Sequence, residues 1–324
     1  MKLNCMTHET ASNIATYVSK CLQLAMLLEV SAYPKPGNVH RTADFQKTGY
    51  EHFLASAVAV APHFKQTAEQ GVRVFKKETA FSQVGIGKTI RNAVKDVLAW
   101  QHGGNTLLGS IILLMPIATA AGLTLAKNGS FSVSKLRTYL KCVCESSTSV
   151  DAVDVYDAIA LAQPGGLGNV PRLDVTDVKS RKKILEEGVN LFKVFEISSP
   201  WDSVSAEWAS NFHITFDFGY PFFKQELEKT KNVNIATVHT YLKILSEVPD
   251  TLINRKAGPE KAGWVSSQAK TTLEIGGLTT EKGRKSVSDL DKKLHDKAHK
   301  LNPGTTADMT SAVLAIAVLN GYRP

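Results

Sequence analysis

The sequence has few cysteines, and none of them forms a pattern that binds metal or builds a disulfide framework. The four cysteines, Cys5, Cys21, Cys142 and Cys144, contain no CxxC pair and no cluster with histidine at zinc spacing. No Ser-, Gly- or Pro-rich tract separates two halves, and the first residues carry no secretory signal pattern. We therefore expect reduced thiols in a cytoplasmic protein. We expect one domain over residues 1–324, with about the first 20 residues at its periphery.

Alternation of apolar and polar residues, which is typical of β-strands, is nearly absent. Apolar residues recur instead at three- and four-residue steps, beginning with Ile14, Val18, Cys21, Ala25 and Leu28. The same spacing predicts helices over residues 50–61, 87–100, 109–126, 132–144, 153–162, 182–195, 201–211, 234–246, 262–275, 288–300 and 307–319. We predict an all-α protein, a compact multi-helix array.

One apolar stretch is long enough to cross a membrane. It runs from Leu107 to Ala126 without a charged residue. Gly109, Pro116 and Gly122 interrupt it, and no positively charged flank supports insertion. We interpret it as a buried central helix and predict no membrane partner.

The basic residues are scattered, although the formal net charge is +8. The densest run, from Lys179 to Lys183, leads directly into Glu186 and Glu187, as a solvated helix face does. Aromatic residues do not alternate with the basic ones, as single-strand binding requires. We predict no nucleic-acid partner, and the positive surplus favours a nucleotide or CoA-like substrate. A homodimer is compatible with this composition.

The first segment rich in chemically active groups is EVSAYPKPGNVHR, residues 29–41, followed by Asp44 and Phe45. Pro34 and Pro36 cannot continue the preceding helix, so an ordered loop is expected from Lys35 onward. Such a loop can grip a phosphate, and it can equally be an ordinary loop at the end of a helix.

Two further segments suit anions. Gly103 and Gly104 precede Asn105 and Thr106, either of which suits the N-cap of the long apolar helix. A helix N-terminus attracts anions, although a simple capped helix explains the pattern as well. The other segment, DTLINRKAG at residues 250–258, places two adjacent cations after a helix end, where they can pair with phosphate or with helix carbonyls.

The fourth segment, NPGTTADM at residues 302–309, opens the last helix. Thr305 or Thr306 suits its N-cap, and Asp308 falls on the stripe of Ala312 and Ala315, so its carboxylate begins on the buried side. It can complement the helix dipole. Together with Glu29 or Asp44 it can also form an oxygen site for Mg²⁺.

These four segments, in this order, resemble the triphosphoribosyl-dephospho-CoA synthase family, from about Gln23 to Asn320. The stretches that carry the likeness are EVSAYPKPGNVHR with DF, GGNTLLGSIILLMPIA, DTLINRKAG and NPGTTADM. The resemblance implies an all-helical transferase that joins ATP to 3′-dephospho-CoA with release of adenine. Its product would be 2′-(5″-triphosphoribosyl)-3′-dephospho-CoA, the precursor of the prosthetic group of citrate lyase or malonate decarboxylase.

Charge assigns roles to residues within this resemblance. Cations and a helix N-terminus are predicted to bind phosphate and ribose: Lys35, Arg41, Arg255 and Lys256, with Asn105 and Thr106. Carboxylates are predicted to hold Mg²⁺: Glu29, Asp44 and Asp308. One of these carboxylates can serve instead as the base that receives the hydroxyl proton, and His40 is a second candidate base.

The middle of the chain departs from the family pattern. Synthases of this family carry a Gly-Ala-Arg-rich, acidic segment where this sequence has AQPGGLG at residues 162–168 and then Asp174 and Val175. This indicates a divergent branch, archaeal in style, and leaves two alternatives open. One is a related ATP-dependent transferase that acts on another cofactor precursor, such as a pterin-type C1 cofactor intermediate. The other is a non-catalytic nucleotide-binding helical protein.

Overall fold

The computed structural model describes residues 8–168, 170, 172–296 and 298–324. In this part of the chain the regular elements are all helical, apart from an isolated β-bridge between His40 and Ala43. The predicted all-α class is confirmed. The α-helices are α1 (His8–Ser31), α2 (Tyr50–Phe75), α3 (Ile86–Trp100), α4 (Leu108–Asn128), α5 (Val133–Glu145), α6 (Ser149–Ala162), α7 (Val178–Glu186), α8 (Leu191–Ser198), α9 (Ser203–Ala209), α10 (Tyr220–Thr230), α11 (Val233–Glu247), α12 (Thr251–Ala257), α13 (Pro259–Glu274), α14 (Glu281–Leu294) and α15 (Gly304–Leu319).

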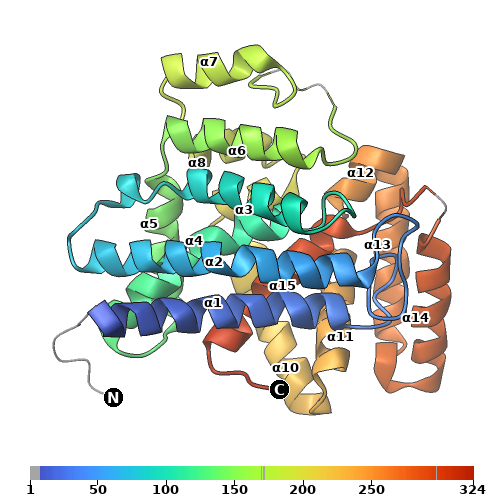
Figure 1. The fold of residues 1–324 in the computed structure, drawn as a ribbon. Helices are drawn as coiled ribbons and strands as arrows, with labels where there is room; N and C mark the ends of the chain where they lie inside the picture. The colour runs from blue at the N-terminus through green and yellow to red at the C-terminus, as the bar shows by residue number, and fades with distance from the viewer. Residues whose placement is uncertain (1–7, 169, 171, 297) are drawn as a thin grey trace.

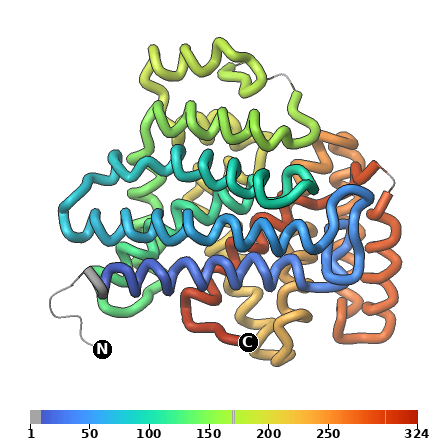
Figure 2. Tube along the Cα trace, viewed as in Figure 1, coloured from blue at the N-terminus to red at the C-terminus, as the bar shows by residue number. Residues whose placement is uncertain are grey.

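The helices form a stack with a smaller bundle at one end. Helices α1, α2, α3, α6 and α7 lie one above another, each in contact with the next, while α11, α13 and α14 stand across the end of the stack (Figure 1). Helix α15 packs against both α1 and α4, so the last helix of the chain lies beside the first (Figure 2). Segments from both ends of the sequence thereby meet in the interior.

Helix α4 is the buried central helix that the sequence predicts. Almost all of its residues are buried, among them Pro116. Two helical segments are long and apolar enough to cross a membrane, Thr10–Ser31 and Leu108–Asn128, and 56% and 83% of their most apolar windows are buried inside the protein. This is the environment of core helices in a soluble protein.

Two glycines let α2 and α4 approach at backbone contact. A methyl group on Gly71 of α2 would collide with the backbone around the Thr119 carbonyl, and one on Gly122 of α4 would collide with the Ala68 carbonyl. Any side chain at either position would force the two helices apart. Gly122 is thus a packing residue of α4 and does not interrupt the helix.

Several predicted helix boundaries are wrong for identifiable reasons. The helix predicted over 182–195 is two helices, because Gly188 adopts φ +63° and Asn190 caps the start of α8. The helix predicted over 288–300 ends at Leu294, and α14 begins earlier, at Glu281. Helix α2 continues through Pro62 to Phe75, well beyond the predicted end. Helices α10 and α12 are not among those predicted.

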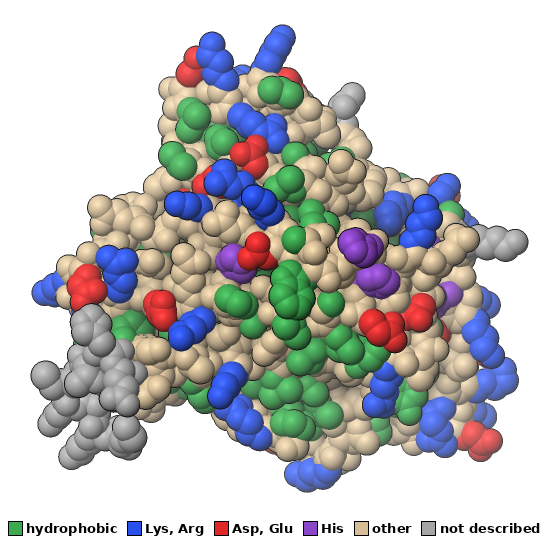
Figure 3. Space-filling view, in the orientation of Figure 1, with side chains coloured by type: hydrophobic (Ala, Val, Ile, Leu, Met, Phe, Trp, Pro, Cys, Tyr) green, Lys and Arg blue, Asp and Glu red, His purple; other side chains and the backbone are tan. Residues whose placement is uncertain are grey.

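The basic run at residues 179–183 is a solvated helix face, as predicted. Lys182 and Lys183 pair with Glu186 and Glu187 one turn on, at 3.5 and 3.7 Å. Figure 3 shows Lys and Arg side chains interspersed with acidic, apolar and uncharged ones over this face of the protein. Among the cysteines, Cys21, Cys142 and Cys144 are free thiols, and Cys5 lies outside the described residues.

Candidate active site

The four segments singled out in the sequence meet around one cavity of about 740 Å³. They reach it from the end of α1, the start of α4, helix α12 and the start of α15, which are far apart in the chain. Five of the predicted site residues lie on its wall together with a sixth from α1: Asn105, Thr106, Arg255, Lys256 and Asp308, with Glu29. A volume of this size is within the range of small-molecule sites.

The loop after α1 is ordered because distant helices hold its backbone. Asn234 on α11 bonds both the N–H and the carbonyl of Tyr33, at 2.9 and 2.7 Å, and the Tyr241 hydroxyl donates to the Pro36 carbonyl at 2.9 Å. On the other side, the Asp291 carboxylate on α14 accepts from the Gly37 N–H at 3.0 Å. The ordered loop predicted from the two prolines is confirmed, and its stiffness comes mainly from these contacts.

Glu29 and Lys35 form a buried ion pair at the base of this loop. The Lys35 side chain has no exposed surface, and its ammonium donates to the Glu29 carboxylate and, at 3.2 Å, to the Glu29 carbonyl. Burial raises the pKa of the Glu29 carboxyl, which Lys35 opposes, and burial lowers the pKa of Lys35, which Glu29 opposes. Lys35 therefore fixes Glu29 at the cavity wall and does not itself line the cavity.

Asp308 faces the start of α4. Its Oδ1 accepts from the Ser110 hydroxyl at 2.6 Å, and any side chain on Gly109 would collide with its carboxylate. Burial raises the pKa of the Asp308 carboxyl to about 7, with the Ser110 hydrogen bond opposing and the negative charge of Glu29 adding to the rise. Asp308 and Glu29 thus place two buried carboxyl groups on one wall, where a cation would be favoured.

A further carboxylate joins the two helix starts that carry the other site residues. Asp250 is fully buried, and its Oδ1 accepts from the N–H groups of Leu252 and Ile253 at the start of α12. Its Oδ2 accepts from the N–H and hydroxyl of Thr306 on α15, both at 2.8 Å. Asp250 therefore fixes α12 relative to Asp308.

The two cations of α12 point into the cavity from its other side. Arg255 donates to the Asp202 carboxylate at 2.7 Å, and its buried Nε has no hydrogen-bond partner among the described residues. Burial, and then the neighbouring charge of Arg255, lower the pKa of Lys256, which makes no ion pair with any described residue. Both side chains retain donors that an anionic ligand would satisfy.

Asn105 and Thr106 lie where α4 begins. The Asn105 Oδ1 accepts from the Leu108 N–H at 3.2 Å, and the Thr106 hydroxyl lies 2.8 Å from that of Ser56 on α2. The positive end of the α4 dipole faces the cavity at this point.

The other predicted residues of the first segment do not line the cavity. His40 is buried, with Nε2 3.2 Å from Asp291 and Nδ1 accepting from Thr42. The exposed Arg41 stacks on the Tyr33 ring at 3.8 Å. Asp44 is exposed and accepts from the Tyr50 N–H at 2.7 Å, which caps α2.

No group of three or more His, Cys, Asp or Glu side chains is arranged to hold a metal ion in the described part of the chain. Mg²⁺ that arrives with a nucleotide needs fewer protein ligands, since one or two carboxylates, water and phosphate oxygens complete its coordination shell. Glu29 and Asp308 fit that requirement, because both are oxygen donors on one wall. Asp44 does not line the cavity.

Sequence reasoning missed residues whose role is to hold others in place. Ser110, Asp202 and Asp250 fix Asp308, Arg255 and the start of α12. Ser110 lies within the second segment and Asp250 opens the third, so both were within reach of motif analysis. Asp202 had no comparable signal, because only the fold brings α9 next to α12.

The sequence pattern of the CitG family, described as ATP:dephospho-CoA triphosphoribosyl transferase, matches residues 15–324. The chain belongs to this family. It is accordingly a transferase that joins the triphosphoribosyl unit of ATP to dephospho-CoA and forms triphosphoribosyl-dephospho-CoA. The resemblance inferred from the four segments is confirmed.

Relatives match nearly the whole length of the transferase. A probable 2-(5″-triphosphoribosyl)-3′-dephosphocoenzyme-A synthase of Pseudomonas fluorescens is 25% identical over 300 residues, which cover 90% of this chain and 88% of the relative. The 2-(5″-triphosphoribosyl)-3′-dephosphocoenzyme-A synthase of Klebsiella pneumoniae is 23% identical, with 91% and 88% covered. The crystal structure of a putative triphosphoribosyl-dephospho-CoA synthase from Archaeoglobus fulgidus shares the fold, with a TM-score of 0.60, 23% identity, and 83% and 100% of the two chains covered.

Proposed function

We propose that the cavity bounded by Glu29, Asp308, Arg255 and Lys256 is where this transferase binds ATP and 3′-dephospho-CoA. The observation that carries the proposal is the pairing of two buried carboxyl groups with two cations that keep unused donors, all on the wall of one cavity. Nucleotide phosphates supply the anions and the carboxylates suit a developing positive charge.

The reaction is a glycosyl transfer that the site must orient. The 2′-hydroxyl oxygen of the acceptor ribose forms a bond to C1′ of the ATP ribose, and the bond from C1′ to the adenine nitrogen breaks. Adenine leaves with that electron pair and takes up a proton, while the hydroxyl proton passes to a base. Charge develops on the ribose ring, so a carboxylate held near C1′ stabilises the transition state.

Position on the cavity wall favours the carboxyl groups of Asp308 and Glu29 over His40 as the base. Asp308 has a pKa near 7 and lies on the cavity wall, which suits a group that accepts a proton at neutral pH. His40 has its ring nitrogens engaged by Asp291 and Thr42, which suits a positioning role for the loop. We assign the proton transfer to Asp308 or Glu29.

Arg255 and Lys256 bind the phosphates in this proposal, together with the α4 N-terminus at Asn105 and Thr106. Whichever of Glu29 and Asp308 does not take the proton would hold Mg²⁺, which when bound shields the charge of the unbroken triphosphate. Lys35 acts through Glu29 in this scheme. Arg41 and Asp44 stay predictions from the sequence, placed on the outer part of the loop.

The proposal also covers the cellular location and the partners of the protein. Free thiols favour the cytoplasm, and the interspersed charges favour small-molecule substrates over nucleic acid or a membrane. A homodimer is compatible with the structure, and the whole chain is proposed to form one domain.

The direct test incubates the protein with ATP, Mg²⁺ and 3′-dephospho-CoA and follows adenine and the heavier CoA adduct by chromatography and mass spectrometry. Adduct with stoichiometric adenine is expected, and both should be lost in Asp308→Ala. The matched control is Asp289→Ala, which removes an exposed carboxylate on α14 that pairs with Lys285. ATP binding without any adduct from the wild type would contradict the proposal and direct the search to another acceptor.

A further inference from the structure

The cavity has two chemically different walls. The wall described above is polar and charged. A second part of the lining comes from α6 and α8, which lie above α4 in Figure 1, and its side chains Val155, Ile159, Val194 and Ile197 are apolar. The triphosphate and ribose of ATP require no apolar wall, and its flat adenine ring would cover only part of one.

Two large apolar side chains at the edge of this wall are open to solvent. Trp201, between α8 and α9, is 37% exposed, and Leu167, in the loop after α6, is 40% exposed, and both line the cavity. Large apolar side chains left open inside a concave site mark surface that a ligand covers.

The apolar wall continues directly into the phosphate-binding part. Gly165 and Gly166 come just before Leu167, and a side chain on either would press against Lys256 or Arg255. A ligand whose phosphates contact these two cations therefore has the apolar wall next to it along the same loop.

We propose that the apolar wall of α6, α8 and Leu167 is the subsite for the pantetheine arm of the acceptor, and that the thiol end of the arm lies beside Trp201 and Leu167. This rests on the proposed function above. Of the two substrates only dephospho-CoA carries a long chain of methylenes and a dimethyl group joined to a diphosphate. The diphosphate, the apolar arm and the thiol follow one another in this molecule, as the two cations, the apolar wall and the exposed Trp201 and Leu167 do in the cavity.

The few polar groups of this wall suit the amides of the arm. The hydroxyls of Ser198 and Ser205 both line the cavity and lie 2.9 Å apart. The Ser198 hydroxyl donates to that of Ser205, which in turn donates to Asp202 at 3.0 Å, so the two oxygens can accept from the amide N–H groups of the arm. The apolar side chains around them exclude water.

Trp201→Ala tests the subsite by kinetics, with Trp264→Ala as the matched control. Trp264, on α13 and outside the cavity, is 38% exposed, so both variants remove an equally exposed indole. Loss of the Trp201 contact should raise KM for dephospho-CoA by about tenfold and leave KM for ATP unchanged. The Trp264 variant should match the wild type in both constants. An equal rise in both KM values, or no change in either, would overturn the proposal.

A second measurement locates the thiol end and does not depend on turnover. Leu167→Cys and Leu185→Cys place a thiol at two exposed positions, the latter on α7 at 50% exposure and outside the cavity. Each is treated with the 2-pyridyl disulfide of dephospho-CoA. The cysteine thiolate attacks the CoA sulfur, a mixed disulfide forms, and 2-thiopyridone leaves with the electron pair.

The proposal predicts that the Leu167 variant reacts at least about tenfold faster than the Leu185 variant, because binding raises the local concentration of the disulfide. Excess S-methyl dephospho-CoA should abolish the difference. Equal rates in the two variants would refute the placement of the arm. If the wild type makes no adduct while the Leu167→Cys variant is still labelled fast, the proposed reaction has failed and this subsite has not.

Discussion

Asp308 and Glu29 place two carboxyl groups on one buried wall, where Lys35 is the only fully buried ammonium that faces either of them among the described residues. The second negative charge is therefore unfavourable until a substrate or cation arrives. Burial raises the pKa of Asp308 to about 7, and the negative charge of Glu29 adds to the rise. A site in this state is ready to accept either a proton or a divalent cation.

In the presence of EDTA, the Asp308→Asn variant should be more stable than the wild type at high pH. The pKa of Asp308 is about 7 in the folded chain and near its ordinary 3.8 when unfolded, so the folded protein binds the proton more tightly. Wild-type stability therefore falls as pH rises from about 4 to 7. The variant lacks this loss, so its advantage in free energy of unfolding should grow by roughly 2 kcal/mol from pH 5 to 8.

Urea unfolding at several pH values measures this difference. Asp289→Asn, which alters an exposed carboxylate, should show a difference from wild type that stays constant over the same range. A constant difference for Asp308→Asn as well would mean that its carboxyl group ionises as it does in water.

Helix phase identified two of the site residues on helices, and it identified neither the cations of α12 nor the loop residues. Glu29 and Asp308 fall on apolar stripes, so their burial could be read from spacing. His40 and Lys35 were assigned by charge alone, and their side chains turn to Asp291 and Glu29 for partners. Asp291 lies on α14, far along the sequence, so no local pattern shows that the loop docks there.

At the scale of elements, the crossing of α2 and α4 depends on the absence of two side chains. Gly71→Ala should lower the free energy of unfolding by roughly 1 to 3 kcal/mol, since the added methyl group meets backbone that cannot move without separating the helices. Gly263→Ala on α13 is the matched control. Nothing lies near its added methyl group, so the ordinary helix preference for alanine should raise stability by about 0.5 to 1 kcal/mol.

Thermal or urea unfolding of both variants measures the contrast. If the two substitutions shift stability in the same direction, the close approach of α2 and α4 has no energetic weight. Helical content by circular dichroism should be unchanged in either case, because both residues lie inside helices.

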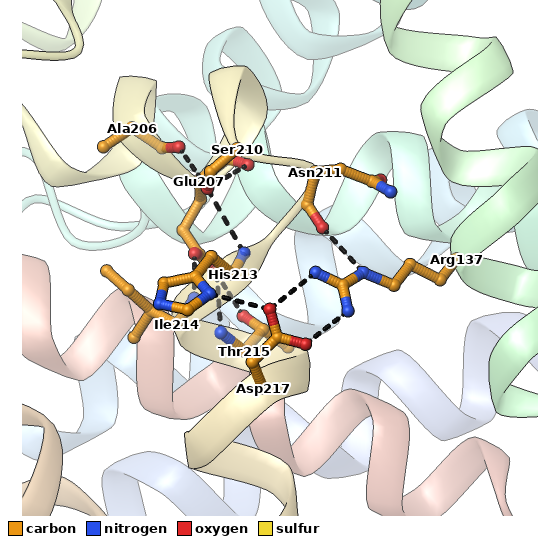
Figure 4. Close-up of polar contacts among 9 residues, drawn as sticks. All are labelled: Arg137, Ala206, Glu207, Ser210, Asn211, His213, Ile214, Thr215 and Asp217. Carbon is orange, nitrogen blue, oxygen red and sulfur yellow. Dashed lines mark hydrogen bonds and ion pairs between the residues drawn. The ribbon is translucent and has the colours of Figure 1, made fainter.

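The turn after α9 is built around one buried acid. Glu207 has no exposed surface, and its carboxylate accepts from the N–H groups of Ile214 and Thr215 at 2.7 and 2.9 Å and from the Thr215 hydroxyl (Figure 4). These are the first residues of a π-helix, Ile214–Gly219. Burial raises the pKa of Glu207 to about 7, which the Thr215 hydrogen bond opposes.

Glu207→Ala should destabilise the protein by roughly 2 to 4 kcal/mol, because it leaves buried N–H groups of the π-helix without acceptors. Glu228→Ala on α10 removes an exposed acid paired with Lys224 at 3.9 Å and should change stability by less than about 0.5 kcal/mol. Denaturant midpoints compare the two. A Glu207 variant as stable as the Glu228 variant would show that water replaces the missing acceptor.

The long helices could be predicted from periodicity because burial of one face sets both the pattern and the element. The irregular elements could not be predicted in this way. Gly188 divides one apolar pattern into α7 and α8, and the π-helix follows Asn211 and Phe212, which both adopt positive φ. The residues that follow are held by the buried carboxylate of Glu207, and no local sequence pattern shows that contact.

At the scale of the whole molecule, the two larger apolar cores among the described residues share two helices. The larger core is built mainly from α1 to α9 and α15, and the smaller from α11 to α14. Helix α11 gives Ala236 and Ile244 to the larger core and Tyr241 and Leu245 to the smaller, while Ala307 of α15 belongs to the smaller. The active cavity takes residues from both parts, so they must hold a fixed relation for the site to exist.

The shared helices predict that the chain unfolds as one domain. Two variants test this, each keeping a single tryptophan of the four in the chain and replacing the others by phenylalanine. Trp208 is buried in the larger core, and Trp264 lies on α13 beside the smaller. For each variant, the urea midpoint from fluorescence is compared with the midpoint from far-ultraviolet circular dichroism. The difference between these midpoints should be the same in the two variants. Two separate midpoints would mean that α11 can leave one core while it stays in the other, and the 1–324 single domain would then be wrong.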